Sequence, residues 1–225
     1  MFLVLAIMFL NYGHIENFLE NTFSGREEVH VSRIIDGDTV ETSIGNVRLL
    51  GINAPEKGEK HYEEAKEFLQ EQIFNKTVQL EFAQDRKDKY NRILAYIFYN
   101  NENINEKIVE NGFANYYFHN GIDFHSNELK NAWDLCIIKK VNLCEPSDDI
   151  CSSCIFLGLN YISNNCSFAC DILNWTIKGE GRNKYIFSEI AMPGKQIKFE
   201  LDLSNSSRSV FLRDKYEKLV LWKSY

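Results

Sequence analysis

The chain has 225 residues, which is enough for one large domain or two small ones. Its hydrophobic content of 44% and charged content of 25% are close to globular averages, which excludes a largely disordered chain. The formal net charge of -7 excludes binding to nucleic acid through a broad basic surface, so an enzyme acting on nucleic acid would need local positive charge and a bound cation.

The first ten residues, MFLVLAIMFL, are all apolar. This run is too short for an ordinary membrane span and is typical of a secretory signal, although no Lys or Arg precedes it and no clear cleavage site follows. We therefore expect residues 1–24 to be a signal peptide or an N-terminal membrane anchor. The protein is then secreted, or membrane-anchored and facing the exterior. The alternatives are a buried N-terminal segment and a wrongly chosen start codon.

Residues 25–145 have the pattern of an α+β domain. Alternating and β-branched residues predict a strand over residues 29–40, which contains the turn Asp36-Gly37-Asp38. Further strands are predicted over residues 47–52, 77–82 and 92–99. Apolar residues at helical spacing predict helices over residues 61–74, 104–111 and 127–141, the second of them closed by Gly112. This order of elements predicts a small β-barrel with helices.

Residues 146–153 are expected to be a linker, because they contain a proline and are acidic or small. The character of the chain then changes, and short β-prone runs separated by turns predict a second, all-β domain over residues 154–225. The expected strands lie within residues 155–162, 168–177, 184–187, 196–201, 210–213 and 218–222.

The six cysteines all lie in the second half of the chain: Cys136, Cys144, Cys151, Cys154, Cys166 and Cys170. An even number of cysteines behind a signal-like start favours a disulfide framework and supports export. The alternative is a zinc site, in which Cys151-x-x-Cys154 supplies two ligands and a more loosely spaced pair supplies the others.

Three short runs carry charges that phosphodiester chemistry uses: residues 35–40, 48–56 and 88–92. Hydrolysis of a phosphodiester needs an activated water, an offset for the charge on the phosphate, and alignment of the reactants. Each run has a structural alternative, since Asp-Gly-Asp alone is usually a turn. The ordered set of three runs is what points to a metal-dependent nuclease.

The first two runs offer oxygen ligands for a hard cation. Asp38 is suited to bind Ca²⁺, and Asp36 could hold waters in the outer shell of the ion. Asn53 and the carbonyl oxygen of Ala54 follow the second predicted strand and could complete the coordination.

The same runs offer the groups for the reaction itself. Glu56 is the natural general base. Arg48 and Arg92 can each make bidentate contacts to phosphate oxygens as charge builds in the transition state. Lys89 and Tyr90 could hold a terminal phosphate or a sugar.

With these residues, the chain resembles the staphylococcal nuclease (thermonuclease) family. The resemblance rests on Asp36-Gly37-Asp38-Thr39, residues 48–56, residues 88–92, residues 94–97 and residues 105–114. It implies an OB-like five-stranded β-barrel with helices and Ca²⁺-dependent cleavage of DNA and RNA. By motif match it also implies Asp38 as calcium ligand, Glu56 as base, and Arg48 and Arg92 as phosphate contacts.

The chain departs from the family pattern at three places. The second calcium-binding Asp of the family falls on Asn53, so one negative charge is lost and calcium affinity should fall. Asn91 replaces a glycine before Arg92, and this change should disturb the turn little because Asn tolerates positive φ. The tyrosines expected near the nucleotide are matched only approximately, by Tyr116, Tyr117 and Phe118.

The second domain resembles a lamin-tail domain on shorter motifs: residues 171–177, Met192-Pro193-Gly194 and residues 210–220. That resemblance implies an immunoglobulin-like β-sandwich. Trp175 is expected to be a core residue, and no ligand is assigned to this domain.

These features lead to one main hypothesis and two alternatives. The main hypothesis is an exported or surface-anchored calcium-dependent nuclease with an accessory β-sandwich. The first alternative is a catalytically weakened nuclease-like module that binds nucleic acid or protein, which Asn53 favours and the retained Asp38, Arg48, Glu56 and Arg92 oppose. The second is an interaction protein organised by zinc.

Overall fold

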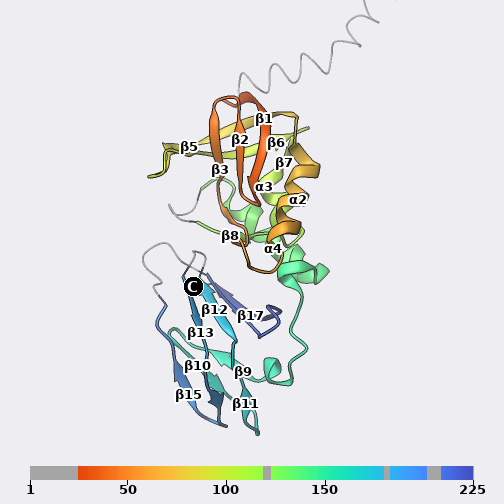
Figure 1. Ribbon diagram of the computed structural model, residues 1–225. Helices are drawn as coiled ribbons and strands as arrows, with labels where there is room; N and C mark the ends of the chain where they lie inside the picture. Colours follow the sequence, from red (N-terminus) through yellow and green to blue (C-terminus); the bar gives the residue numbers. More distant parts are fainter. Residues whose placement is uncertain (1–24, 119–122, 180–182, 202–208, 225) are drawn as a thin grey trace, which may run out of the picture.

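The computed structural model contains two domains, an α+β domain followed by an all-β domain (Figure 1). It describes residues 25–118, 123–179, 183–201 and 209–224. The predicted signal peptide or anchor, residues 1–24, therefore lies outside the described residues. Across the parts of the chain that the structure describes, no helix has the length and apolar character needed to span a membrane.

The first domain is built on a closed sheet of five strands. These are β1 (Glu27–Asp36), β2 (Thr39–Thr42), β3 (Gly45–Leu49), β5 (Thr77–Lys87) and β6 (Ile93–Tyr99), in the order β3-β2-β1-β5-β6. A parallel pairing between β3 and β6 joins the two edges, which removes the exposed edges of the sheet. Short β7 (Glu102–Asn103) pairs with the end of β6. The predicted five-stranded barrel is confirmed.

Three helices cover the barrel: α2 (Tyr62–Ile73), α3 (Ile104–Glu110) and α4 (Ser126–Lys139). Helix α2 buries Ala65, Leu69 and Ile73, the spacing that brings side chains to one helical face. Helix α3 begins at Asn103, whose side chain accepts hydrogen bonds from two backbone N–H groups of the first turn. The predicted helices are confirmed with ends shifted by at most three residues.

The predicted strand over residues 47–52 is interrupted by a turn at Leu50 and Gly51. After this turn, β4 (Ile52–Asn53) leaves the barrel and pairs with β8 (Asn115–Tyr116). In this pairing Asn53 lies opposite Asn115, and Ile52 lies opposite Tyr116. The sequence did not indicate β8, because a strand of two residues carries no periodicity to detect.

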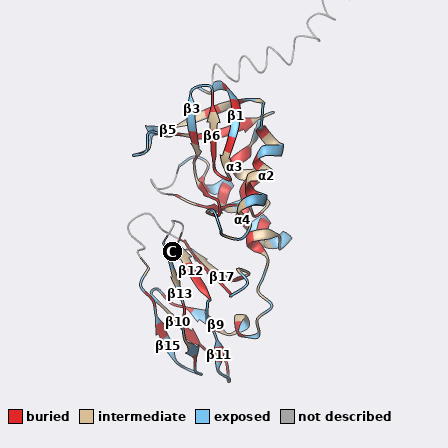
Figure 2. Ribbon diagram, viewed as in Figure 1, coloured by how far each residue is buried: buried red, intermediate tan, exposed pale blue. Residues whose placement is uncertain are grey.

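The second domain is all-β, as predicted, and the strands that the structure describes there pair with one another in antiparallel fashion. Its sheets have the orders β15-β10-β9, β11-β14 and β13-β12-β16-β17. They enclose a second hydrophobic core around Trp175, the predicted core residue. Buried residues lie along the barrel strands of the first domain and along the strands of the second domain (Figure 2). The immunoglobulin-like topology and the lamin-tail resemblance stay predictions.

The bounds of these elements are β9 (Ile155–Leu157), β10 (Tyr161–Asn164), β11 (Cys170–Asp171), β12 (Thr176–Gly179), β13 (Lys184–Ile186), β14 (Ile190–Ala191), β15 (Gln196–Lys198), β16 (Ser209–Arg213) and β17 (Leu219–Ser224). Two 3₁₀ turns, η1 (Asn142–Cys144) and η2 (Ile150–Ser153), connect the domains.

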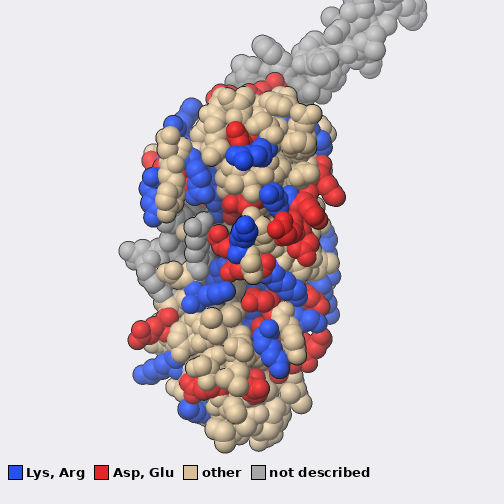
Figure 3. Space-filling view, in the orientation of Figure 1, with Lys and Arg blue, Asp and Glu red and all other residues tan. Residues whose placement is uncertain are grey.

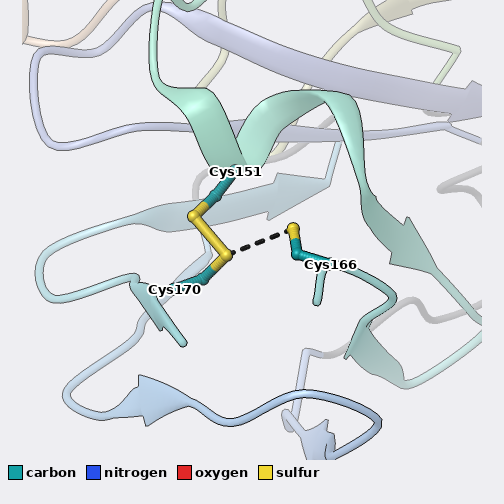
Figure 4. Close-up of side chains that lie close together, drawn as sticks. All are labelled: Cys151, Cys166 and Cys170. Carbon is teal, nitrogen blue, oxygen red and sulfur yellow. Dashed lines mark hydrogen bonds between the residues drawn. A yellow bond between two sulfur atoms is a disulfide. The ribbon is translucent and has the colours of Figure 1, made fainter. Parts of the chain in front are cut away.

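All six cysteines form disulfides, in the pairs Cys136–Cys144, Cys151–Cys170 and Cys154–Cys166. The last two bonds lie side by side in the second domain, where Cys166 Sγ is 3.4 Å from Cys170 Sγ (Figure 4). The predicted disulfide framework is confirmed. The zinc alternative is contradicted because every thiolate it needs is consumed by a sulfur–sulfur bond.

The two domains share part of their cores through β16, in which all five residues are buried. Because side chains alternate along a strand, Val210 and Leu212 enter the core of the second domain, while Phe211 enters the core of the first. The Phe211 ring makes an edge contact with the Trp133 ring on α4, with 5.1 Å between centroids. Strand β16 is therefore covered by protein on both faces.

The predicted linker, residues 146–153, is held against the second sheet. The Ser147 amide donates to the Leu219 carbonyl at 2.8 Å, and the Leu219 amide donates to the Glu145 carbonyl at 2.8 Å. The side chain of Arg213 donates to the Leu143 carbonyl at 2.6 Å. These bonds fix the direction in which the chain leaves the first domain.

Because Phe211 completes a core that both domains share, Phe211→Ala should lower the free energy of unfolding by about 3–5 kcal/mol. Urea denaturation followed by circular dichroism measures this loss, and the two domains should unfold in one transition. Phe124→Ala is the matched control, since Phe124 is 94% exposed, and should change stability by less than about 0.5 kcal/mol. Two separate transitions with the first domain unaffected would contradict the shared core.

Candidate active site

The turn between β1 and β2 carries the first two candidate residues. The Asp38 amide donates to Asp36 Oδ1 at 3.1 Å, and the Thr39 hydroxyl donates to Asp38 Oδ1 at 3.0 Å. A Cβ atom on Gly37 would lie 2.8 Å from the Cβ atoms of both Ala54 and Ala65. The glycine therefore lets this turn pack directly against the segment after β4 and against α2.

The Asp38 carboxylate connects this turn to two other segments. Its Oδ2 atom accepts a hydrogen bond from the Ala54 amide at 3.0 Å and lies 2.9 Å from Arg48 Nη2 on β3. The same Nη2 atom donates to Asn53 Oδ1 at 3.4 Å. A guanidinium nitrogen thus contacts the side-chain oxygens of both Asp38 and Asn53, two of the three residues predicted to bind calcium directly.

Burial and the nearby charge of Asp38 raise the pKa of Asp36 from its ordinary 3.8 to about 6. A cation close to Asp36 would oppose this rise and favour the ionised form of Asp36. The side-chain nitrogen of Asn53 is buried and has no hydrogen-bond partner among the described residues. The structure places Ala54 against Asp38 through its amide, while the predicted role of the Ala54 carbonyl oxygen stays a prediction.

A cleft of about 860 Å³ opens beside this cluster, between the β3–β4 segment and the connection from β5 to β6. Five of the predicted site residues line it: Arg48, Asn53, Lys89, Tyr90 and Arg92. The lining does not include Asp36, Asp38, Ala54 or Glu56. Arg48 and Asn53 therefore connect the cleft to the Asp38 carboxylate.

The cleft wall carries five basic side chains, from Arg48, Arg86, Lys87, Lys89 and Arg92, and three acidic ones. Figure 3 shows Lys and Arg side chains at the edge of the first domain where the β5 connection projects in Figure 1. The sequence analysis did not assign Arg86 or Lys87 to the site. This local excess of positive charge is what an acidic protein needs in order to hold a polyanion.

The connection from β5 to β6 is organised by Asp88, which the sequence analysis did not single out. Its Oδ1 atom accepts from the amides of Tyr90 and Arg92, both at 2.9 Å, and its Oδ2 atom accepts from Arg92 Nε at 2.7 Å. Burial raises the pKa of Asp88, but the hydrogen bonds from Arg92 outweigh it and the pKa lies below its ordinary value. Asn91 has a φ of 64°, the conformation expected for this substitution. Asp88 therefore fixes the Arg92 side chain.

Two of the three aromatic residues predicted to lie near a nucleotide line the cleft, namely Tyr117 and Phe118. Tyr116 does not. It is buried and makes a hydrogen bond to the Ser209 hydroxyl at 2.5 Å, in the core that joins the domains. Tyr117 and Phe118 follow the end of β8, whereas the Tyr116 ring packs edge-on against Trp133 and Phe211 in that core.

Glu56, the predicted base, is half-buried in the loop between β4 and α2. Its amide donates to Glu59 Oε2 at 2.9 Å, and its carbonyl accepts from the Glu59 amide at 2.8 Å. Glu59 thus closes a tight turn that begins at Glu56. The sequence analysis did not identify Glu59. The signal that could have indicated Glu59 is a carboxylate four residues after Pro55, in the loop that follows β4.

Comparison with known proteins identifies relatives for the first domain. The family model described as staphylococcal nuclease homologue matches residues 46–144, which contain Arg48, Asn53, Glu56 and Arg92 and begin after Asp38. The thermonuclease of Staphylococcus hyicus is 30% identical over 122 residues, covering 50% of this chain and 72% of that protein. The thermonuclease of Staphylococcus intermedius is 29% identical over 157 residues, covering 64% and 94%.

A third relative is a Haemophilus influenzae protein named an uncharacterized endonuclease, which is 35% identical over 125 residues. The alignment covers 52% of this chain and 69% of that protein. These three relatives are matched over most of their own length, and the family model spans Arg48, Asn53 and the connection from β5 to β6. The chain belongs to the staphylococcal nuclease family.

Proposed function

We propose that this protein is a calcium-dependent nuclease that hydrolyses phosphodiester bonds in DNA and RNA. One observation carries the proposal: Arg48 Nη2 lies between the oxygens of Asp38 and Asn53, at the wall of a basic cleft. Family membership supports the reaction class, and the thermonuclease relatives support nucleic acid as substrate.

The residues present fit a calcium ion. Carboxylate, amide and carbonyl oxygens are the ligands that calcium prefers, and Asp38, Asn53, Asp36 and Ala54 supply all three kinds. The contacts of the positively charged Arg48 nitrogen with the Asp38 and Asn53 oxygens support a cation near these oxygens. A bound calcium ion would offset negative charge on the substrate phosphate.

The protein side chains supply the remaining steps. Glu56 accepts the proton of the attacking water. Arg48 and Arg92 hold the phosphate oxygens as negative charge builds on them, and Asp88 keeps Arg92 in one orientation. Lys89 and Tyr90 hold a terminal phosphate or a sugar next to the cleft.

We also propose that the protein is exported, or anchored by its N-terminal segment and exposed outside the cell. The three disulfides support this location, because disulfides persist in oxidising environments. The apolar run over residues 1–10 supports it from the sequence.

A second candidate function is a weakened module that binds nucleic acid or protein without cleaving it. The ion pair of Arg48 with Asp38 favours this candidate, since the carboxylate is already neutralised by the protein. Asn53 favours it too, because it supplies one negative charge less than Asp. If calcium changes neither the melting temperature nor the activity, the binding module is the correct function.

Glu56→Gln should lower the rate of plasmid and RNA cleavage by roughly 10²–10⁴-fold, because the amide cannot accept the proton of the water. Calcium binding should be unchanged, since Glu56 is assigned no metal contact. Cleavage is measured with calcium and with a chelator.

The matched control is Glu67→Gln, the same change at an exposed position of α2, which should leave the rate unchanged. Full activity of Glu56→Gln would eliminate Glu56 as the base.

Asn53→Asp should raise calcium affinity by about tenfold, which corresponds to about 1.4 kcal/mol, because ligand charge strengthens calcium binding. Isothermal titration calorimetry measures the affinity. Asn127→Asp adds the same charge at an exposed position of α4 and should have no effect. Equal affinities for wild type and Asn53→Asp would remove Asn53 from the metal site.

The stabilisation by calcium should depend on pH through Asp36. Its pKa is about 6 in the folded protein and lower in the unfolded chain, so the folded state holds more protons between about pH 4 and pH 6. Stability without calcium therefore falls as pH rises through this window. Since calcium needs the ionised carboxylate, the increase in Tm on adding calcium should be larger at about pH 7.5 than at about pH 5. Asp36→Asn should abolish this difference, and a difference that persists in the variant would exclude Asp36.

A further inference from the structure

One face of the sheet β13-β12-β16-β17 is turned toward the nuclease domain. The strand register places Lys184 opposite Lys178, Lys178 opposite Phe211, and Phe211 opposite Trp222. Residues directly opposite in adjacent strands point to the same face. These four residues therefore form a row across the sheet, hereafter called the contact row. Its basic end contacts Glu59, and its aromatic end contacts Tyr116.

The basic end of the contact row binds Glu59. Lys178 Nζ lies 3.1 Å and 3.3 Å from the two carboxylate oxygens of Glu59, and Lys184 Nζ lies 3.6 Å from one of them. The side chains of Lys178 and Glu59 are only 15% and 23% exposed, so this pair is less screened than a surface ion pair. Burial would raise the pKa of Glu59, but the Glu56 amide and Lys178 outweigh it and keep the carboxylate ionised.

Glu59 connects the two lysines to Glu56 through hydrogen bonds. Its carboxylate accepts the Glu56 amide, and its own amide donates to the Glu56 carbonyl. The backbone of the proposed base is thus held on both sides by a single residue, and the side chain of that residue is fixed by the second domain.

The aromatic end of the contact row supports the proposed metal ligand. Phe211 and Trp222 each make edge contacts with the ring of Tyr116, at 6.1 Å and 6.4 Å between centroids. Tyr116 lies on β8, whose pairing with β4 places Asn115 opposite Asn53. The second domain therefore contacts β8, which pairs with the strand that carries Asn53. It also contacts Glu59, which closes the turn that carries Glu56.

We propose that the second domain is a positioning element of the active site: its contact row, through Glu59 and Tyr116, fixes the segment from Asn53 to Glu56. Lys178 and Glu59 are positioning residues, because neither touches the substrate. This inference rests on the proposed function, in which Glu56 is the base. Its physical basis is that a catalytic group must be held close to its productive geometry, and a displacement of about 1 Å can reduce the rate by about 10²-fold.

The test uses the double variant Lys178→Met/Lys184→Met in the full chain, which removes both charges and keeps the apolar stems. The kcat for a short oligonucleotide should fall about tenfold or more, with KM unchanged. Hydrogen exchange of the Glu56 amide, followed by NMR or on a peptide spanning residues 51–61, should become faster because Glu59 is released. The single variant Lys178→Arg keeps the ion pair with Glu59, so its kcat and its exchange rate should equal those of the wild-type protein.

The control is Lys195→Met, which breaks an exposed ion pair with Glu189 inside the second domain. It should change neither kcat nor the exchange rate. In the double variant, an unchanged kcat, an unchanged exchange rate, or a change confined to KM would each overturn the positioning role. If the wild-type protein has no nuclease activity, the proposed function fails, and the exchange rate alone then decides whether the second domain fixes this turn.

Discussion

The candidate site depends on one carboxylate. Asp38 accepts a hydrogen bond from the Ala54 amide and pairs with Arg48, so it joins the β1–β2 turn, strand β3 and the segment after β4. The Leu49 amide also donates to the Asp38 carbonyl at 2.9 Å, so the backbone and the side chain of Asp38 both connect the turn to β3. The Arg48 guanidinium has three oxygen partners, on Leu49, Asn53 and Asp38, and these contacts offset the loss of its hydration. The same arrangement makes the position attractive to a metal ion.

The second domain is joined to the first by contacts of several kinds. Phe211 contributes to the first core, Arg213 binds the Leu143 carbonyl, and Lys178 binds Glu59. A strand buried on both faces cannot be separated without exposing apolar surface on both sides, which costs free energy in proportion to the area exposed. Composition and fold class change at the domain boundary in the sequence. The hydrophobic core of the first domain nevertheless includes a residue of the second domain, Phe211. This continuity distinguishes the molecule from a nuclease with a tethered accessory module.

Much of the fold could be predicted from the sequence. The barrel strands and three helices carry clear periodicity, as in α2, where Ala65, Leu69 and Ile73 share one face. The charged runs also identified most of the residues that line the cleft. Asp88 and Glu59 were missed because their roles arise from tight turns, in which one carboxylate accepts several amides and no repeating pattern marks it. Tyr116 was expected near a nucleotide but is buried against Ser209 and Phe211 of the second domain, a long-range contact that no local pattern indicates.

By itself, the sequence determined the fold classes of the two domains and the set of charged residues available for chemistry, and it favoured disulfides over a zinc site. Each of these follows from local pattern or composition, which the order of residues contains directly. Only the tertiary structure decided that Arg48 lies between Asp38 and Asn53, which cysteines pair, and that β16 is covered on both faces. These are contacts between residues distant in the chain, and their geometry is set by barrel closure and domain packing, which no short stretch of sequence specifies.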